Sequence, residues 1–206
     1  MGAFDALVGF SRILPEVRRP ERRIPFSEKV FWTGLVVVVF LIMSNVPLYG
    51  IPRLYGAYDP FFMMRIIFAS NRGTLTELGI GPIVTAGLIM QLMAGSKIIQ
   101  IDLTKPEDRS KFTAATKALT VFVITFEAAA YVIGGAYGPL SPSAELAVFL
   151  QLVAGSLIIM YLDELVQKGW GLGSGISVFI ATGVATQVFW RCLDPWPGDR
   201  YPSGAL

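Results

Sequence analysis

The chain has 206 residues, of which 53% are hydrophobic and 16% are charged, and its net charge is +2. A soluble domain is about 25% charged, so the composition favours a membrane protein, and so small a net charge gives no support to nucleic-acid binding. The chain has no histidine, the commonest metal ligand and general base, and its single cysteine excludes an internal disulfide. We therefore expect no metal site, no cofactor and no enzymatic activity.

The N-terminal region, residues 1–29, lacks the apolar core of a cleavable signal peptide. We interpret it as an amphipathic segment on the cytoplasmic side. Five stretches with few or no charges follow, each close to the roughly 20 apolar residues that a helix needs to cross a membrane. The predicted spans are residues 30–52, 78–96, 118–138, 146–162 and 171–192.

The lysines and arginines between the spans predict the orientation, because cytoplasmic connections are enriched in them. A cytoplasmic N-terminus places twelve of them inside: Arg12, Arg18, Arg19, Arg22, Arg23, Lys29, Lys97, Lys105, Arg109, Lys111, Lys117 and Lys168. The outside set has five: Arg53, Arg65, Arg72, Arg191 and Arg200. Residues 194–206 then form a polar external loop, and an odd number of spans ending there suggests that the chain is truncated.

One segment between the first two spans is helical in character but too short to cross the membrane. Asp59 is a good N-cap residue, and Pro60 suits the first helical position. The polar residues 70–73 interrupt the helix before the second span begins. We interpret residues 59–69 as a short external helix that dips toward the bundle.

Four glycines alternate within residues 169–175, directly before the apolar part of the last span. Their spacing does not fit the G-x-G-x-x-G fingerprint of a dinucleotide-binding loop, and the chain has no Walker-type phosphate loop. Gly171 and Gly175 instead form a small-residue pair of the kind that lets membrane helices pack closely. The stretch is interpreted as the pliable cytoplasmic entrance to the fifth span.

Two pairs of branched aliphatic residues occur where spans begin. Ile176 and Ile180 are four residues apart and share a helix face, and Ile80 and Val84 repeat this pattern in the second span. By spacing alone, ordinary packing against lipid or neighbouring helices explains both pairs.

Glu127 is the one ionisable residue in the middle of a predicted span. Such residues are costly in lipid and usually face a cavity or a polar partner, so a small-solute transporter or ion channel that uses Glu127 is one hypothesis. A hydrogen-bonded contact between helices is another, and a membrane scaffold whose spans only pack is a third. Asn45, Thr85, Gln91 and Gln151 are possible partners. The adjacent carboxylates Asp163 and Glu164 are interpreted as charges at a helix end.

Six stretches of the sequence form a specific set of motifs: residues 14–17 (LPEV), 20–26 (PERRIPF), 69–75 (ASNRGTL), 77–85 (ELGIGPIVT), 163–165 (DEL) and 169–176 (GWGLGSGI). They closely resemble SecY, the pore subunit of the Sec protein-conducting channel, which is called the Sec translocon alpha subunit in eukaryotes. The sequence of these stretches is of the archaeal type.

The resemblance implies an all-α, polytopic membrane helix bundle. The family has ten spans in two inverted halves, and this chain corresponds to the first half, with five spans and a short plug helix. Ile80, Val84, Ile176 and Ile180 match positions of the pore ring. Thr85 and Glu127 match the polar cluster of the lateral gate, although many relatives carry glutamine at the second position. The plug corresponds to Asp59, Pro60, Phe61, Phe62, Met63, Met64, Arg65, Ile66, Ile67, Phe68 and Ala69.

The resemblance also implies a function and partners. A SecY channel passes unfolded secretory polypeptides across the membrane and releases transmembrane segments laterally into lipid. The expected partners are a SecE-type (gamma) subunit, a SecG- or beta-type subunit, the ribosome with its nascent polypeptide, signal peptides and membrane lipid. Nucleic acid enters only through the ribosome. The expected location is the plasma membrane, as a multi-pass protein with a cytoplasmic N-terminus.

Overall fold

The computed structural model describes residues 2–11, 14–51, 65, 67–99, 101, 104–138 and 140–193. Within these residues the structure is helical, apart from one antiparallel bridge between Pro47 and Thr74. The prediction of an all-α helix bundle is confirmed. The elements are α1 (Gly2–Ser11), α2 (Phe26–Asn45), α4 (Gly81–Gly95), α5 (Pro106–Ile133), α6 (Pro142–Leu165), the π-helical turn η1 (Val166–Trp170) and α7 (Gly175–Leu193).

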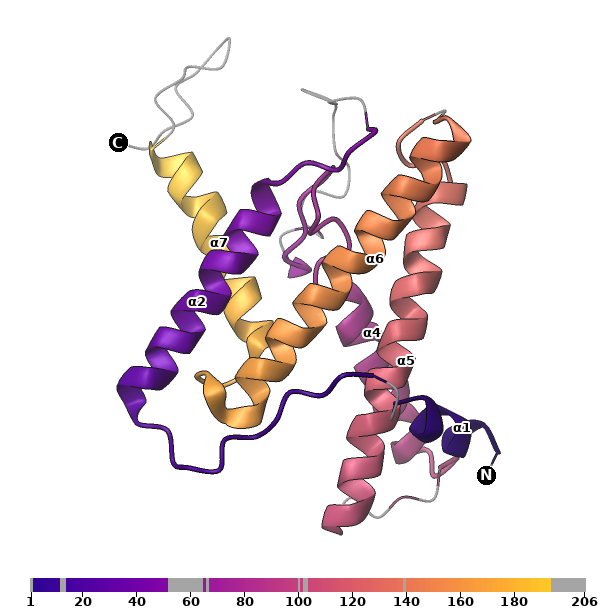
Figure 1. Cartoon of the computed structure of the whole chain (residues 1–206), viewed down its shortest axis with the longest axis vertical. Coiled ribbons are helices and arrows are strands. Elements are labelled where there is room, and N and C mark those ends of the chain that lie inside the picture. The colour runs from indigo at the N-terminus through magenta and orange to yellow at the C-terminus, as the bar shows by residue number, and fades with distance from the viewer. Residues whose placement is uncertain are drawn as a thin grey trace.

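The helices form two groups that meet at α6 (Figure 1). On one side α5 packs against α4, α6 and the short α1, and on the other side α7 packs against α2 and α6. The extended segment that follows α1 crosses the lower end of the bundle in the figure to reach α2. The described residues of the connection between α2 and α4 lie among α2, α6 and α7.

The helices overlap all five predicted spans, with different limits. Three of them are long and apolar enough to cross a membrane, namely Phe26–Asn45, Pro106–Ile133 and the combined helix Pro142–Trp170. Gly81–Gly95 and Gly175–Phe189 are apolar but shorter. The predicted plug helix falls mainly outside the described residues, since of its members only Arg65 and residues 67–69 are described. The predicted external loop, residues 194–206, also lies outside them.

Local chemistry explains the different limits of two helices. α2 ends at Asn45 instead of continuing to residue 52, because Val46 precedes Pro47 and adopts the extended conformation that a following proline favours. α5 begins twelve residues before the predicted start at 118. Pro106 occupies its first turn together with two acidic residues, which favour a helix N-terminus, and a search for uncharged residues overlooks such a polar turn.

α4 begins at Gly81 and not at residue 78, where the predicted span begins, because a sharp turn precedes the helix. The N–H of Ile80 donates a hydrogen bond to the carbonyl of Phe68 at 2.9 Å, which places the plug end beside α4. Gly79 makes this turn with a φ of +56°, a region that favours glycine. A Cβ at this position would lie 2.1 Å from the Phe68 oxygen.

Gly79→Ala is therefore expected to destabilise the protein by about 2–4 kcal/mol, through left-handed strain and displacement of the Phe68 carbonyl. The thermal unfolding midpoint of the purified full-length protein measures this effect. Gly87→Ala is the matched control, because Gly87 lies within α4 and a Cβ there meets no atom within 4 Å. An unfolding midpoint for Gly79→Ala at or above that of Gly87→Ala would contradict this account of the turn.

Two apolar clusters fill the bundle, and its outer faces are apolar as well. One cluster lies among α2, α4, α6 and α7, and the other lies between α5 and α6. Phe122 and Phe126 on α5 and Leu146 and Leu150 on α6 are all more than half exposed. Exposing such apolar faces to water is unfavourable, whereas lipid tails solvate them. The surface therefore fits a bundle embedded in a membrane.

Candidate functional site

The four residues of the predicted pore ring lie at one apolar cluster, which we call the central cluster. Ile80 is 1% exposed and belongs to its core, together with Phe40 of α2 and Phe179 of α7, whose ring centroids are 4.9 Å apart. Val84, Ile176 and Ile180 are half-buried and pack against this core. The remaining core members are Val36, Met43, Ala69, Ile159 and Val166.

The start of α4 and the first two turns of α7 therefore bring the two predicted pairs to the same place. Ile80 and Val84 stand one turn apart, as Ile176 and Ile180 do, so each pair presents one face to the cluster. Ala69, the last residue of the predicted plug, is 5% exposed in the same cluster. The end of the predicted plug thus packs in the same cluster as the four aliphatic side chains.

The two predicted gate residues lie on neighbouring helices, α4 and α5. Thr85 is exposed, and Glu127 is half-buried in the C-terminal part of α5. A Cβ on Gly81 would lie 3.8 Å from Oε2 of Glu127, so this carboxylate sits beside the first turn of α4. Two of its possible partners are engaged elsewhere, because Gln151 bonds the backbone of Tyr49 and Asn45 bonds its own helix.

A buried ion pair holds the end of the predicted plug and was not predicted from the sequence. Arg65 Nη1 lies 2.7 Å from Oε1 of Glu77, whose side chain is 1% exposed, and Oε2 of Glu77 accepts a hydrogen bond from the N–H of Gly73. The signal that could have identified the pair is the position of the two charges, one in an apolar helix and the other at the edge of an uncharged run. Their separation of twelve residues gives no local pattern.

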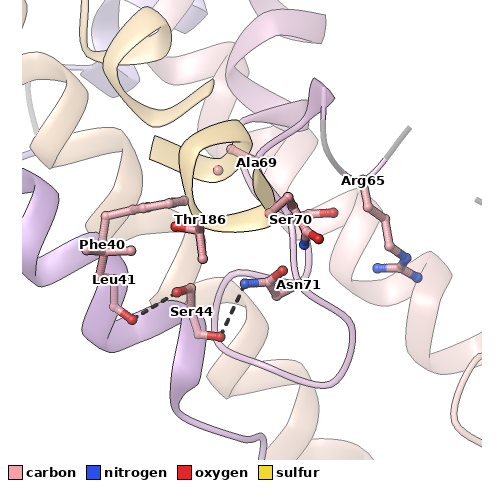
Figure 2. A pocket seen from close by; sticks show the side chains of 10 residues that line it. Phe40, Leu41, Ser44, Arg65, Ala69, Ser70, Asn71 and Thr186 are labelled. Atoms are coloured by element: carbon pink, nitrogen blue, oxygen red, sulfur yellow. Dashed lines mark hydrogen bonds between the residues drawn. The ribbon is translucent and has the colours of Figure 1, made fainter. Parts of the chain in front are cut away.

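The loop after the plug also contacts α2 and α7 around a small pocket. Asn71 donates a hydrogen bond of 3.4 Å to the carbonyl of Ser44, as Figure 2 shows. The backbone adds hydrogen bonds between this loop and the end of α2, from Leu48 to Gly73 and from Leu75 to Val46. The pocket is lined by Phe40, Leu41, Ser44, Arg65, Ala69, Ser70, Asn71, Gly183, Thr186 and Gln187.

The glycine stretch forms the turn between α6 and α7, and its packing differs from the prediction. Gly171 and Gly175 do not form a small-residue pair on one helix, because α7 begins at Gly175 and Gly171 is extended. Each makes a close contact of its own. A Cβ on Gly171 would lie 3.0 Å from the side chain of Val166, and one on Gly175 would lie 2.5 Å from Oδ1 of Asp163.

The adjacent carboxylates Asp163 and Glu164 point to different partners. Asp163 is 5% exposed and accepts a hydrogen bond from the N–H of Ile176 at 3.0 Å, so it caps the next helix. Glu164 pairs with Lys117 of α5 and Lys168 of η1, each at 2.8 Å. The interpretation as charges at a helix end holds for their position, but it missed the capping role.

Lys117 and Lys168 also hold the segment that follows α1. Lys117 Nζ donates to the carbonyl of Pro15 at 2.6 Å, and Lys168 Nζ lies 2.5 Å from the Glu16 carboxylate. This ammonium lowers the pKa of Glu16, first through the hydrogen bond and then through charge attraction. Trp170 Nε1 donates to the carbonyl of Arg18 at 2.9 Å. The N-terminal segment is thereby attached to α5 and to η1.

The described residues offer no group of three or more histidine, cysteine, aspartate or glutamate side chains able to hold a metal ion. The features with functional potential are therefore an apolar cluster and the polar groups at its borders. These features suit a constriction or a packed interface.

A family model described as SecY matches residues 74–196 of the chain, which is more than half of its length. The chain belongs to the SecY family. A second family model, the plug domain of Sec61p, matches residues 38–73, which contain the predicted plug helix. The membership confirms the resemblance found in the sequence.

Known relatives cover nearly all of the chain. It is 48% identical to the protein translocase subunit SecY of Aeropyrum pernix, over 100% of this chain and 46% of that protein. It is 45% identical to the SEC61 subunit alpha of Debaryomyces hansenii, over 93% of this chain and 40% of that protein. The chain thus spans less than half the length of these relatives.

Solved structures agree with the fold. A structure described as a protein conducting channel matches with a TM-score of 0.80 and 44% identity, over 92% of this chain and 43% of that one. Sec61 in a canine ribosome-channel complex from the endoplasmic reticulum matches equally well over the same shares. Together with its apolar helices, these matches identify this SecY-family chain as a multi-pass membrane protein.

Proposed function

We propose that the chain forms the pore ring, the plug and one side of the lateral gate of a protein-conducting channel. The channel passes unfolded secretory polypeptides and releases transmembrane segments into lipid. The observation that carries this proposal is the meeting of Ile80, Val84, Ile176 and Ile180 with the plug end at the central cluster, in a chain of the SecY family.

The chemistry of these side chains suits the task. Branched aliphatic groups make a hydrophobic and deformable constriction, and such a constriction blocks ions by staying dry. It offers no hydrogen-bonding groups, so it discriminates little between the sequences that pass. The plug end, Ala69, seals the same cluster in the resting state.

Glu127 and Thr85 supply the polar part of the gate. A carboxylate at a lateral gate that faces lipid is costly. An apolar signal helix that binds the open gate shifts the equilibrium between the closed and open gate toward opening. The energy for transport comes from partners, and the chain itself has no enzymatic role. The proposed partners are a SecE-type subunit, a SecG- or beta-type subunit and the translating ribosome, and the proposed location is the plasma membrane with the N-terminus in the cytoplasm.

The test is transport by the full-length protein with its partner subunits in liposomes. We expect a secretory polypeptide with a signal sequence to become protected from added protease inside the vesicles. The competing hypothesis is a small-solute transporter that uses Glu127. It predicts uptake of a solute that Glu127→Gln abolishes, without protection of any polypeptide, and this result would contradict the proposal.

Glu127→Leu is expected to raise the signal hydrophobicity needed for gate opening. Leucine replaces a half-buried carboxylate beside the first turn of α4 and so favours the closed gate by about 1–2 kcal/mol. On the membrane-insertion scale this corresponds to about two to six added leucines in the signal. Protection assays over a graded series of signals measure this threshold. Glu127→Gln keeps a polar group, and Thr125→Leu changes an exposed residue of the same helix, so both should keep the original threshold. An unshifted threshold for Glu127→Leu removes Glu127 from the gate.

A further inference from the structure

Asp163, near the end of α6, accepts two hydrogen bonds, one from the beginning of α7 and one from η1. Its Oδ1 accepts from the backbone N–H of Ile176 at 3.0 Å, and its Oδ2 accepts from Nε2 of Gln167 at 2.6 Å. The carboxylate is buried, and it satisfies one of the N–H groups that the first turn of a helix leaves without a partner. The residue whose N–H it binds is Ile176, a member of the proposed ring.

The surrounding turn leaves little freedom for α7 to shift along α6. Gly175 approaches Asp163 so closely that a Cβ would lie 2.7 Å from the Asp163 Cα. Gly169 reverses the chain with a φ of +102°, which favours glycine. On the other side, the N–H of Leu172 donates to Oγ1 of Thr33 on α2 at 2.9 Å. The turn is thus fixed to both α6 and α2, which differs from the pliable entrance predicted from the glycines.

We propose that Asp163 is a positioning residue of the constriction. By holding the N–H of Ile176, with Gly175 closely packed against it, Asp163 fixes the height and rotation of the first turns of α7. Ile176 and Ile180 lie on the same face of α7, so the Asp163 carboxylate sets where both side chains reach the central cluster. This inference rests on the proposed function of that cluster as the pore ring.

The test compares three variants of the full-length protein reconstituted into liposomes, with resting ion conductance as the readout. Asp163→Ala removes the acceptor and is expected to raise the resting conductance about fivefold, the factor that corresponds to a typical loss of a helix cap. Asp163→Asn keeps an oxygen that accepts from Ile176 and should seal like the unchanged protein. Gly175→Ala displaces the carboxylate while retaining it, and should leak like Asp163→Ala.

Ser141→Ala is the matched control, because Ser141 caps the N-terminus of α6 from outside the central cluster. It should leave the resting conductance unchanged. Equal leaks from Ser141→Ala and Asp163→Ala would overturn the positioning role, since any lost cap would then suffice. Should Asp163→Ala fail to fold, Gly175→Ala decides, and normal sealing in that variant overturns the inference.

A fifth variant, with serine at all four ring positions, separates this inference from the proposed function. Leakage from the serine variant together with tight sealing by both Asp163→Ala and Gly175→Ala would overturn the positioning role alone. Tight sealing by the serine variant as well would overturn the pore ring itself. The expected result is leakage from the serine, Asp163→Ala and Gly175→Ala variants, with sealing by Asp163→Asn and Ser141→Ala.

Discussion

Replacing Ile80, Val84, Ile176 and Ile180 together with serine is expected to make the full-length channel leak ions at rest. The four side chains lie at one apolar cluster, and serine hydroxyls would let water enter the constriction that these side chains keep dry. We expect the resting conductance to rise by about tenfold or more, since each 1.4 kcal/mol removed from a barrier corresponds to roughly a factor of ten. Conductance across planar bilayers measures the change directly.

The matched control removes four apolar side chains from the same two helices, at exposed positions that do not belong to the central cluster. It replaces Leu88, Leu92, Val184 and Val188 with serine. This variant should conduct no more than the unchanged protein, because its substitutions lie away from the central cluster. Equal conductance in the ring and control variants would show that the leak reflects a general loss of packing.

Glu77→Ala is expected to destabilise the protein by about 3–5 kcal/mol, the usual cost of removing one partner of a buried ion pair. The Glu77 carboxylate is 1% exposed, and its loss leaves the largely buried guanidinium of Arg65 without this counter-charge. The thermal unfolding midpoint of the purified full-length protein should fall accordingly. Because Arg65 lies at the plug end, the resting seal should weaken as well.

Two comparisons make this prediction specific. Glu145→Ala removes an exposed carboxylate from the first turn of α6 and should change the unfolding midpoint little. Replacing both Arg65 and Glu77 with leucine removes the pair together, so it should recover part of the stability lost in Glu77→Ala. A double variant less stable than Glu77→Ala would contradict the assignment of the loss to the removal of one partner from a buried ion pair.

The positions of the helices could be predicted largely from the sequence, because a membrane span needs a long uncharged run. Their ends could not, since they depend on local features of another kind. The polar first turn of α5, which begins at Pro106, is as helical as the apolar part. Gly79 lies within an uncharged run, yet it serves a turn that contacts Phe68.

The candidate site could be predicted only in part, and mainly through the family resemblance. The spacing of Ile80 and Val84, or of Ile176 and Ile180, is equally typical of ordinary packing, and only the fold brings the pairs together. Glu77 and Asp163 act on groups twelve and thirteen residues away in sequence, across turns with no regular pattern. Contacts of this kind are set by tertiary structure, and a single sequence leaves several possible partners for each of these carboxylates.

Crosslinking to a translocating polypeptide tests whether Ile80 and Ile176 line the pore. One cysteine replaces Ile80 or Ile176 in a full-length protein whose native free thiol, Cys192, is changed to serine, and a stalled nascent chain carries a second cysteine. The same cysteine at Leu92, which is 71% exposed on α4, serves as the control. We expect adducts with the nascent chain at Ile80 and Ile176 and none at Leu92. Adducts at Leu92 alone, or at no position during active translocation, would contradict this expectation.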